Sequence, residues 1–348
     1  MKISIGTNIK DGPWGGGNLF AINLRNFLLS KGHTVVTNLD DNDIDIILIT
    51  EPRKTSESSA FTHIDVKNYL NLINSDALVV HRINECDERK NTNFVNRYLI
   101  EANKIADYTV FVSSWLKNLY VNQGISKKNN HVLLAGANKD IFNPENKVNW
   151  EQIEKLKIVT HHWGANWNKG FEIYSHLDTL LAKDYWKDKI EFTYIGNLPK
   201  NFTFQNTKHI QPLSGNNLAN EIKKNHLYIT GSLNEPSGNH HIEASQCGLP
   251  VMYINSGGVE EYCKGFGVEY TNSNIEEKIH YVLNNYGMLS KKMSKYPFSS
   301  DLMSKDFLNL FLEMLEKKEI LLNERFIKKT AYVEKIFFLL KRFLKSKN

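Results

Sequence analysis

Short apolar runs with strand character alternate with helical patterns along most of the chain. The runs are KISIGTNI, HTVVTNL, DIDIILIT, ALVVHRI, YTVFVSS and HVLLAG, followed by KIVTHHW, IEFTYIGN, HLYITGSL and LPVMYIN. Between the first two, NLFAINLRNFLLSKG places Leu24, Phe27 and Leu28 on one helical face. This helix is expected to end at Gly32. Because strand–helix alternation builds a parallel sheet covered on both faces, the pattern predicts an α/β fold.

The chain length indicates more than one domain. At 348 residues the chain is longer than one ordinary hydrophobic core supports. A polar segment, ANKDIFNPENKVNWEQIEK, separates the two sets of strand-like runs. We therefore predict two doubly wound, Rossmann-like domains that face a central cleft, over residues 1–145 and 146–300, with C-terminal helices over 301–348. In such sheets, ligands bind at the carboxyl ends of the strands, beside helix N-termini.

Cysteine use and hydropathy bear on the cellular location. The three cysteines are isolated and form no Cys-x-x-Cys pair, which favours a reducing compartment. The N-terminal MKISIGTNIK lacks the apolar core of a signal peptide. No run approaches the roughly 20 apolar residues that a membrane-spanning helix needs. We expect a cytoplasmic protein.

Residues 324–348 form a basic tail. The formal net charge of the chain is +5, and this tail alone contributes +6, from eight Lys or Arg and two Glu, so the rest is close to neutral. A neutral body does not favour nucleic acid as a partner. The tail also carries apolar residues at helical spacing, which predicts peripheral contact with the inner face of a membrane. The alternative is a helix that packs across the domains.

Two loops after predicted strands have the composition of anion sites. In the first, Gly15, Gly16 and Gly17 precede a helix, so backbone amides can approach a ligand closely. Their spacing is neither GxGxxG nor GxxxxGK[ST], which argues against a dehydrogenase or a P-loop NTPase. In the second, THHWGANWNKGF, Lys169 opens a helix where an ammonium can meet a diphosphate. The alternatives are a surface turn and a solvated lysine.

The segment NEPSGNHHIEASQCGLPV carries two glutamates. Pro236 and Gly238 predict a turn after the strand HLYITGSL, so Glu235 stands at the strand exit and Glu243 one to two turns into the next helix. A sugar nucleotide over this helix would place its hexose near Glu235 and its ribose near Glu243. The free amides of Ser237, Gly238 and Asn239 would take phosphate or sugar oxygens. The alternative is an ordinary helix with Glu243 on its surface.

These motifs resemble those of the retaining nucleotide-sugar glycosyltransferases of family 4, which have the two-domain GT-B fold. The resemblance lies in EPSGNHHIEASQCGLPV, where a Glu is followed after seven residues by Glu-Ala and then by Gly-x-Pro-Val. It extends to NSGGVEEYC, to the KG of residues 169–170, to the triple glycine and to VFVSSWLKNLY followed by GANKDIFNP. The motifs occur in the family's order over roughly residues 1–290.

The resemblance implies roles for individual residues. Glu235 would contact donor sugar hydroxyls, Glu243 the ribose, and Lys169 with the Gly16 and Gly17 amides the departing diphosphate. His81 resembles a histidine of the N-terminal domain that faces the donor sugar, and a structural role is its alternative. The side chains of Arg82, Glu85, Asp87 and Arg89 are alternatives for the acceptor, a glycan or lipid-linked sugar. No cofactor is implied beyond the nucleoside-diphosphate sugar, which is the donor substrate.

The chain departs from the family's pattern before the lysine. Trp163 and Gly164 stand where an arginine is usual, so we expect Arg82, Arg89 or Asn166 to replace it, or donor handling to differ. Two histidine pairs, at 161–162 and 240–241, invite a metal site. Because adjacent helical residues point about 100° apart, each pair is a poor chelate, and we predict no metal.

Other functions remain compatible with these residues. A nucleotide-sugar epimerase or a phosphorylase uses the same fold, the first without an acceptor and the second with inorganic phosphate. A non-catalytic sugar-nucleotide or glycan-binding protein is the third alternative. The presence of both glutamates and Lys169 argues against a protein that has lost catalysis, and the family resemblance implies transfer with retention of the anomeric configuration.

Overall fold

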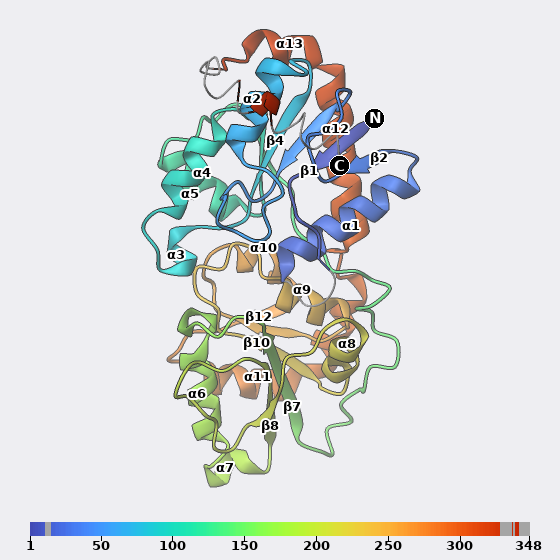
Figure 1. Ribbon diagram of the computed structural model, residues 1–348. Coiled ribbons are helices and arrows are strands. Elements are labelled where there is room, and N and C mark those ends of the chain that lie inside the picture. The colour runs from blue at the N-terminus through green and yellow to red at the C-terminus, as the bar shows by residue number, and fades with distance from the viewer. Residues whose placement is uncertain (11–14, 328–335, 337, 341–348) are drawn as a thin grey trace.

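The computed structural model describes residues 1–10, 15–327, 336 and 338–340. Two α/β domains lie end to end (Figure 1). The N-terminal sheet has six parallel strands in the order β2-β1-β3-β4-β5-β6. They are β1 (Lys2–Ile5), β2 (Thr34–Val36), β3 (Ile46–Ile49), β4 (Leu78–Ile83), β5 (Tyr108–Phe111) and β6 (Asn130–Val132). The order changes direction between β1 and β3, so that is where a ligand is expected.

The C-terminal sheet also has six parallel strands, in the order β12-β11-β10-β7-β8-β9. They are β7 (Leu156–His162), β8 (Ile190–Gly196), β9 (Lys208–Ile210), β10 (Leu227–Thr230), β11 (Val251–Tyr253) and β12 (Gly267–Glu269). The strand order reverses between β7 and β10, which is the usual ligand-binding point of a doubly wound sheet. The predicted fold of two doubly wound α/β domains is thus confirmed. The sequence patterns missed β9 and β12, which are only three residues long and are partly exposed.

Helices cover both faces of the N-terminal sheet. They are α1 (Gly16–Ser30), α2 (His63–Leu72), α3 (Asp87–Lys90), α4 (Val95–Asn103) and α5 (Ser114–Asn122). Successive residues of a strand point to opposite faces. On β4, Val80 packs into the cluster that contains α1, and Val79 packs into the cluster that contains α2.

The helices of the C-terminal domain also form two layers. They are a 3-10 turn (Trp167–Lys169), α6 (Phe171–Leu180), α7 (Asp184–Lys187), α8 (Gly215–Lys223), α9 (Asn239–Gln246), α10 (Val259–Cys263), α11 (Ile275–Lys292) and a 3-10 turn (Met293–Lys295). One core cluster joins α6 and α11 to the sheet, and the other joins α8, α9 and α10 to it.

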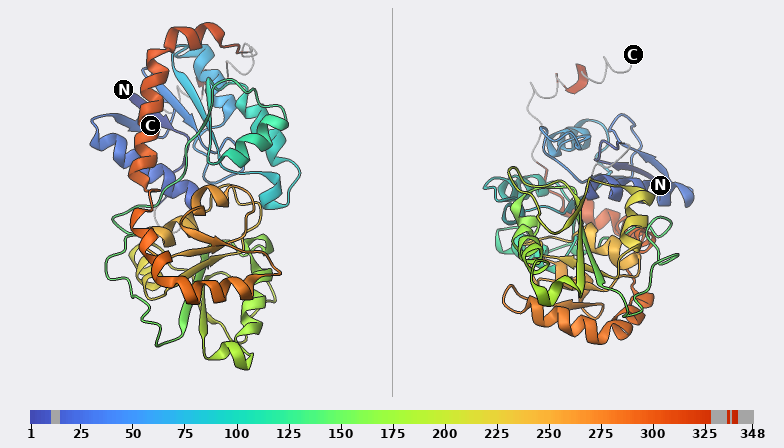
Figure 2. Two further views of the ribbon diagram at one scale, coloured as in Figure 1. Left: turned by 180° about the vertical axis from the view of Figure 1, so that it is seen from behind. Right: turned by 90° about the horizontal axis from the view of Figure 1, so that it is seen from below.

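The C-terminal helices lead the chain back to the N-terminal domain. Helix α12 (Ser300–Glu316) packs along α1, with Phe307 edge-on to Phe20 at a centroid distance of 5.1 Å (Figures 1 and 2). Helix α13 (Lys318–Glu324) follows, and Arg325 forms an ion pair with Asp107 at 2.5 Å. The predicted amphipathic tail of 324–348 lies mainly outside the described residues. None of the helices that the structure describes is long and apolar enough to cross a membrane.

Candidate active site

The turn between β10 and α9 holds Glu235 in a fixed backbone position. The Gly258 N–H donates to the Glu235 carbonyl at 2.8 Å. A Cβ on Gly257 would lie only 2.3 Å from that same oxygen, and the φ of Gly257 is +76°. Glycine is therefore required at 257, where the loop NSGG packs against the backbone of Glu235.

The loop after β7 brings Lys169 to the same place. The Leu233 N–H donates to the Asn168 carbonyl at 2.8 Å. A Cβ on Gly170 would lie 2.7 Å from Gly231, and the φ of Gly170 is +105°. The loops that leave β7 and β10 are thus packed together, which sets Lys169 beside Glu235. Lys169 ends the 3-10 turn and α6 begins at Phe171, so the expected helix start at Lys169 is two residues early.

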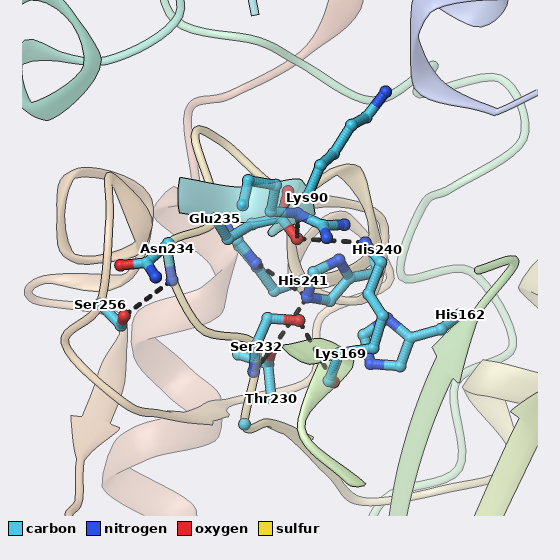
Figure 3. A network of polar contacts seen from close by, with 12 residues as sticks. Lys90, His162, Lys169, Thr230, Ser232, Asn234, Glu235, His240, His241 and Ser256 are labelled. Carbon is cyan, nitrogen blue, oxygen red and sulfur yellow. Dashed lines mark hydrogen bonds and ion pairs between the residues drawn. The ribbon is translucent and has the colours of Figure 1, made fainter. Parts of the chain in front are cut away.

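Two cations from different domains converge on one oxygen of Glu235. Its Oε2 lies 3.1 Å from Lys169 Nζ and 3.0 Å from Arg89 Nε (Figure 3 shows Lys169 and Glu235). The three side chains are at most 14% exposed. Burial alone would raise the pKa of Glu235, but Lys169 and Arg89 outweigh it and lower this pKa to about 2. Glu235 is therefore an ionised carboxylate that fixes two cations.

A second carboxylate from the N-terminal domain lies close by. Glu85, in the loop after β4, forms an ion pair with Lys90 at 3.3 Å. Burial raises the pKa of Glu85, against the opposing effect of Lys90. Helix α3 and the loop before it therefore line the N-terminal side of the site with charge.

The glycine loop meets the N-terminus of α9. A Cβ on Gly16 would lie 3.0 Å from the Asn239 side chain, so these two predicted residues are brought together. Beside Gly15 and Gly17, an added Cβ would meet no heavy atom of the described residues within 4 Å. Gly238 caps α9 with φ +80°, and Ser237 precedes it, half-buried.

Glu243 lies inside the domain and not on its surface. Its Oε2 pairs with His161 Nε2 at 2.9 Å, and both residues are buried. The other ring nitrogen of His161 lies 3.3 Å from the Tyr228 hydroxyl. This hydrogen bonding uses Oε2 of Glu243 and orients the carboxylate.

The remaining histidines of the two pairs pack against one another with their rings tilted or edge-on. The rings of His162 and His240 lie 4.5 Å apart, and those of His240 and His241 lie 4.9 Å apart. Burial lowers the pKa of His241 to about 3, and lowers the pKa of His162 and His240 well below the usual value. These rings are therefore neutral at physiological pH. In the described part of the chain, no group of three or more His, Cys, Asp or Glu side chains is arranged to hold a metal ion.

His81 lies away from this group. It is completely buried on β4, on the α2 face of the sheet with Val79, and its Nδ1 contacts Asn103 of α4 at 3.2 Å. Burial lowers the pKa of His81 to about 3. Arg82, the next residue, is on the α1 face and stacks on Phe20 at 3.8 Å. The structure therefore does not bring His81 together with Glu235.

A contact that the sequence motifs did not predict joins the domains at α5. Glu261 accepts hydrogen bonds from the Ser114 N–H at 2.7 Å and the Trp115 N–H at 3.1 Å, at the N-terminus of α5. The Tyr262 hydroxyl donates to the Val112 carbonyl at 2.5 Å. Helices α9 and α10 lie at the boundary between the domains, and α3 lies at one side of it (Figure 1). The NSGGVEEYC loop thus both supports Glu235 and connects the domains.

The comparisons with known proteins concern both this site and the whole fold. Residues 199–298 match the family model described as Glycosyl transferases group 1. No curated protein matches the chain. A glycosyltransferase from Rickettsia africae ESF-5 has a similar structure, with a TM-score of 0.66, 16% identity, and coverage of 90% of this chain and 98% of that one.

Two further solved structures have the same fold. Anabaena Alr3699/HepE in complex with UDP and glucose gives a TM-score of 0.64, 11% identity, and coverage of 89% of this chain and 99% of that one. Sucrose-phosphate synthase from Thermosynechococcus elongatus gives a TM-score of 0.64 and 13% identity, with coverage of 90% of this chain and 99% of that one. The chain therefore has the two-domain fold of these proteins, and its match to Glycosyl transferases group 1 covers the segment that holds both Glu235 and Glu243.

Proposed function

We propose that the protein is a glycosyltransferase that moves a sugar from a nucleoside-diphosphate sugar to an acceptor, with retention of the anomeric configuration. The observation that carries this proposal is the Lys169–Glu235 pair at the point where the C-terminal sheet reverses its order. A buried ammonium there can neutralise a diphosphate, and the ionised carboxylate can accept from sugar hydroxyls. The match to Glycosyl transferases group 1 over residues 199–298 supports it.

The donor would lie over the N-terminus of α9. The amides of Ser237, Gly238 and Asn239 and those of the glycine loop would bind the diphosphate, because unpaired helix-terminal N–H groups attract anions. Glu243, oriented by His161, would accept from the ribose hydroxyls. Anabaena Alr3699/HepE was solved with UDP-glucose, so uridine nucleotides are the first donors to test.

The acceptor would enter from the N-terminal domain. We propose a glycan or lipid-linked sugar whose hydroxyl oxygen bonds to the anomeric carbon while the bond from that carbon to the β-phosphate oxygen breaks. The leaving phosphate takes the hydroxyl proton, and Lys169 stabilises its charge without a metal ion. Closure of the domains around both substrates would exclude water. We further propose a cytoplasmic protein whose basic tail holds it near a membrane.

The test is a thermal-shift screen in the presence of EDTA with UDP, GDP, ADP, dTDP and their sugar conjugates. A ligand at 100 times its Kd stabilises the fold by about 2.7 kcal/mol. We expect one sugar conjugate to stabilise the protein selectively, and its diphosphate to be released only when an acceptor is added.

Variants and products complete this test. Glu235→Gln should lower turnover roughly 100-fold or more, whereas Glu191→Gln, an exposed change on β8, should leave it unchanged. Donor conversion without an acceptor would favour an epimerase, a requirement for phosphate a phosphorylase, and selective binding without turnover a binding protein. An inverted product would refute retention.

A further inference from the structure

Arg89 is a cation of the N-terminal domain that lies beside Glu235. It lies on α3, within the charged run DERK, and its side chain is 10% exposed. Burying a guanidinium is costly unless it is paired. The partner that offsets this cost, Glu235, belongs to the other domain.

The contact leaves most of the guanidinium unused. Arg89 reaches Glu235 through Nε, and within the described residues its two terminal Nη groups have no hydrogen-bond partner. Arginine presents five N–H donors in a rigid fork that suits two oxygens of one phosphate. Lys169 has the same arrangement, with one contact to Glu235 and further donors available.

The charge balance of this group favours an anion. Lys169 and Arg89 contribute two positive charges against the single charge of Glu235, while Lys90 is paired with Glu85. Because Lys169 and Arg89 are both within about 3 Å of the same carboxylate oxygen, they lie close enough to contact one diphosphate together. One carboxylate offsets only part of the charge of this pair of cations. The pair can therefore also bind a more highly charged anion, such as a diphosphate.

We infer that Arg89 is a phosphate-binding residue, and that the diphosphate of the donor is held between Lys169 of one domain and Arg89 of the other. This inference rests on the proposed function and adds the residue that completes the site. It also means that the donor site is complete only when α3 is docked on the turn that carries Glu235.

The test compares a diphosphate with the monophosphate of the same base. Affinities for UDP and UMP, or for the pair whose base the thermal-shift screen selects, are measured by isothermal titration with the full-length protein. Arg89→Gln should weaken binding of the diphosphate roughly 10- to 100-fold, because a hydrogen bond to a charged group is lost. Binding of the monophosphate should change by less than about threefold. Arg97→Gln, an exposed change on the neighbouring α4, is the matched control and should alter neither affinity.

Each other outcome has a defined meaning. Equal loss of affinity for both nucleotides would show that Arg89 only joins the domains, and unchanged affinities would show that Arg89 has no role in binding. Either result overturns the inference while the proposed function stands. Wild-type protein that binds no nucleotide would refute both. Circular dichroism checks the fold, and Arg89→Lys, which keeps the charge without the fork, should give an intermediate loss of diphosphate affinity.

Discussion

The two domains have the same six-stranded parallel architecture but different interiors where they face each other. In the N-terminal domain the sheet beside α1 is sealed by apolar contacts, including those of α12. In the C-terminal domain this region holds buried polar rings, among them His161 and His162 at the end of β7 and His240 in α9. Where the domains face each other, the N-terminal one is therefore held by apolar packing, whereas the C-terminal one adds a buried polar network to its apolar cores.

This difference fits the part that each domain plays in the proposed donor site. A polar interior can orient Glu243 and support the turn that carries Glu235, because His161 contacts the Glu243 carboxylate and His240 contacts the Thr230 hydroxyl. An apolar interior gives α1, and the glycine loop before it, a rigid support.

Loss of packing between α1 and α12 should have the largest effect on stability. Phe307→Ala removes a ring that is 1% exposed and contacts Phe20, so we expect a loss of about 3–5 kcal/mol. Leu312→Ala, on the same helix but 44% exposed, is the matched control and should cost far less. Urea denaturation measures both. Equal losses would contradict the view that α12 is part of the N-terminal core.

Loss of the buried ammonium should act on catalysis. Lys169→Gln removes the cation that the proposal assigns to the leaving diphosphate, so kcat/KM should fall roughly 100- to 1000-fold. Lys104→Gln, an exposed lysine of the N-terminal domain, should have no effect. Donor turnover measured by release of nucleoside diphosphate is the readout. A Lys169→Gln protein with normal turnover would remove Lys169 from the mechanism.

Acid should destabilise the C-terminal domain through its histidines. The pKa of His241 is about 3 in the fold, below its ordinary value of 6.5, so the unfolded chain binds this proton first and stability falls as the pH drops below 6.5. At pH 5 this costs on the order of 2 kcal/mol for one such ring. His241→Gln should therefore lose less stability between pH 7 and pH 5 than the wild type. Identical losses in urea denaturation would contradict a neutral, buried His241.

Glu235 should add a second loss of folding stability, at lower pH than the loss caused by the histidines. Its pKa of about 2 lies below the ordinary 4.5, so its contribution to stability is fully present above pH 4.5 and is lost as the pH falls toward 2. Glu235→Gln should remove that step while leaving the loss below pH 6.5 in place. Denaturation midpoints at pH 5, 4 and 3 measure it. A step of unchanged size in the variant would show that other carboxylates cause it.

The contact between Glu261 and α5 should have the smallest effect. Glu261→Ala removes an acceptor at a helix N-terminus, which costs about 1 kcal/mol. Glu260→Ala changes the adjacent residue, whose partners are Lys264 and Asn255 of its own domain. Hydrogen exchange at the Ser114 and Trp115 amides should accelerate only in the first variant. Equal acceleration in both would mean that the Glu261 contact does not protect α5.

The site residues that were predicted from the sequence are those that follow the carboxyl ends of parallel strands. Glu235, Lys169 and Asn239 follow strands of the same sheet, so a parallel arrangement brings them together without further information. Gly16 follows the first strand of the other sheet, and the structure places it against Asn239. Local pattern was sufficient at these positions because the fold class dictates where strand ends lie.

Contacts that depend on the relation between the domains could not be read from the pattern. Arg89 was one of several candidate charges, and only the tertiary structure pairs it with Glu235. His81 and Arg82 illustrate a further limit, since neighbouring residues of a strand point to opposite faces and nothing local says which face lies toward the ligand. Both are buried, but only Arg82 is on the α1 face.

The most direct test of the central claim is whether Glu235 recognises the sugar of the donor. Isothermal titration compares a nucleoside-diphosphate sugar with the bare nucleoside diphosphate for the wild type and for Glu235→Gln. We expect Glu235→Gln to weaken binding of the sugar conjugate by at least about tenfold more than binding of the diphosphate, because hydroxyl contacts to a charged acceptor are lost. Equal affinities of the variant and the wild type for both ligands would contradict it.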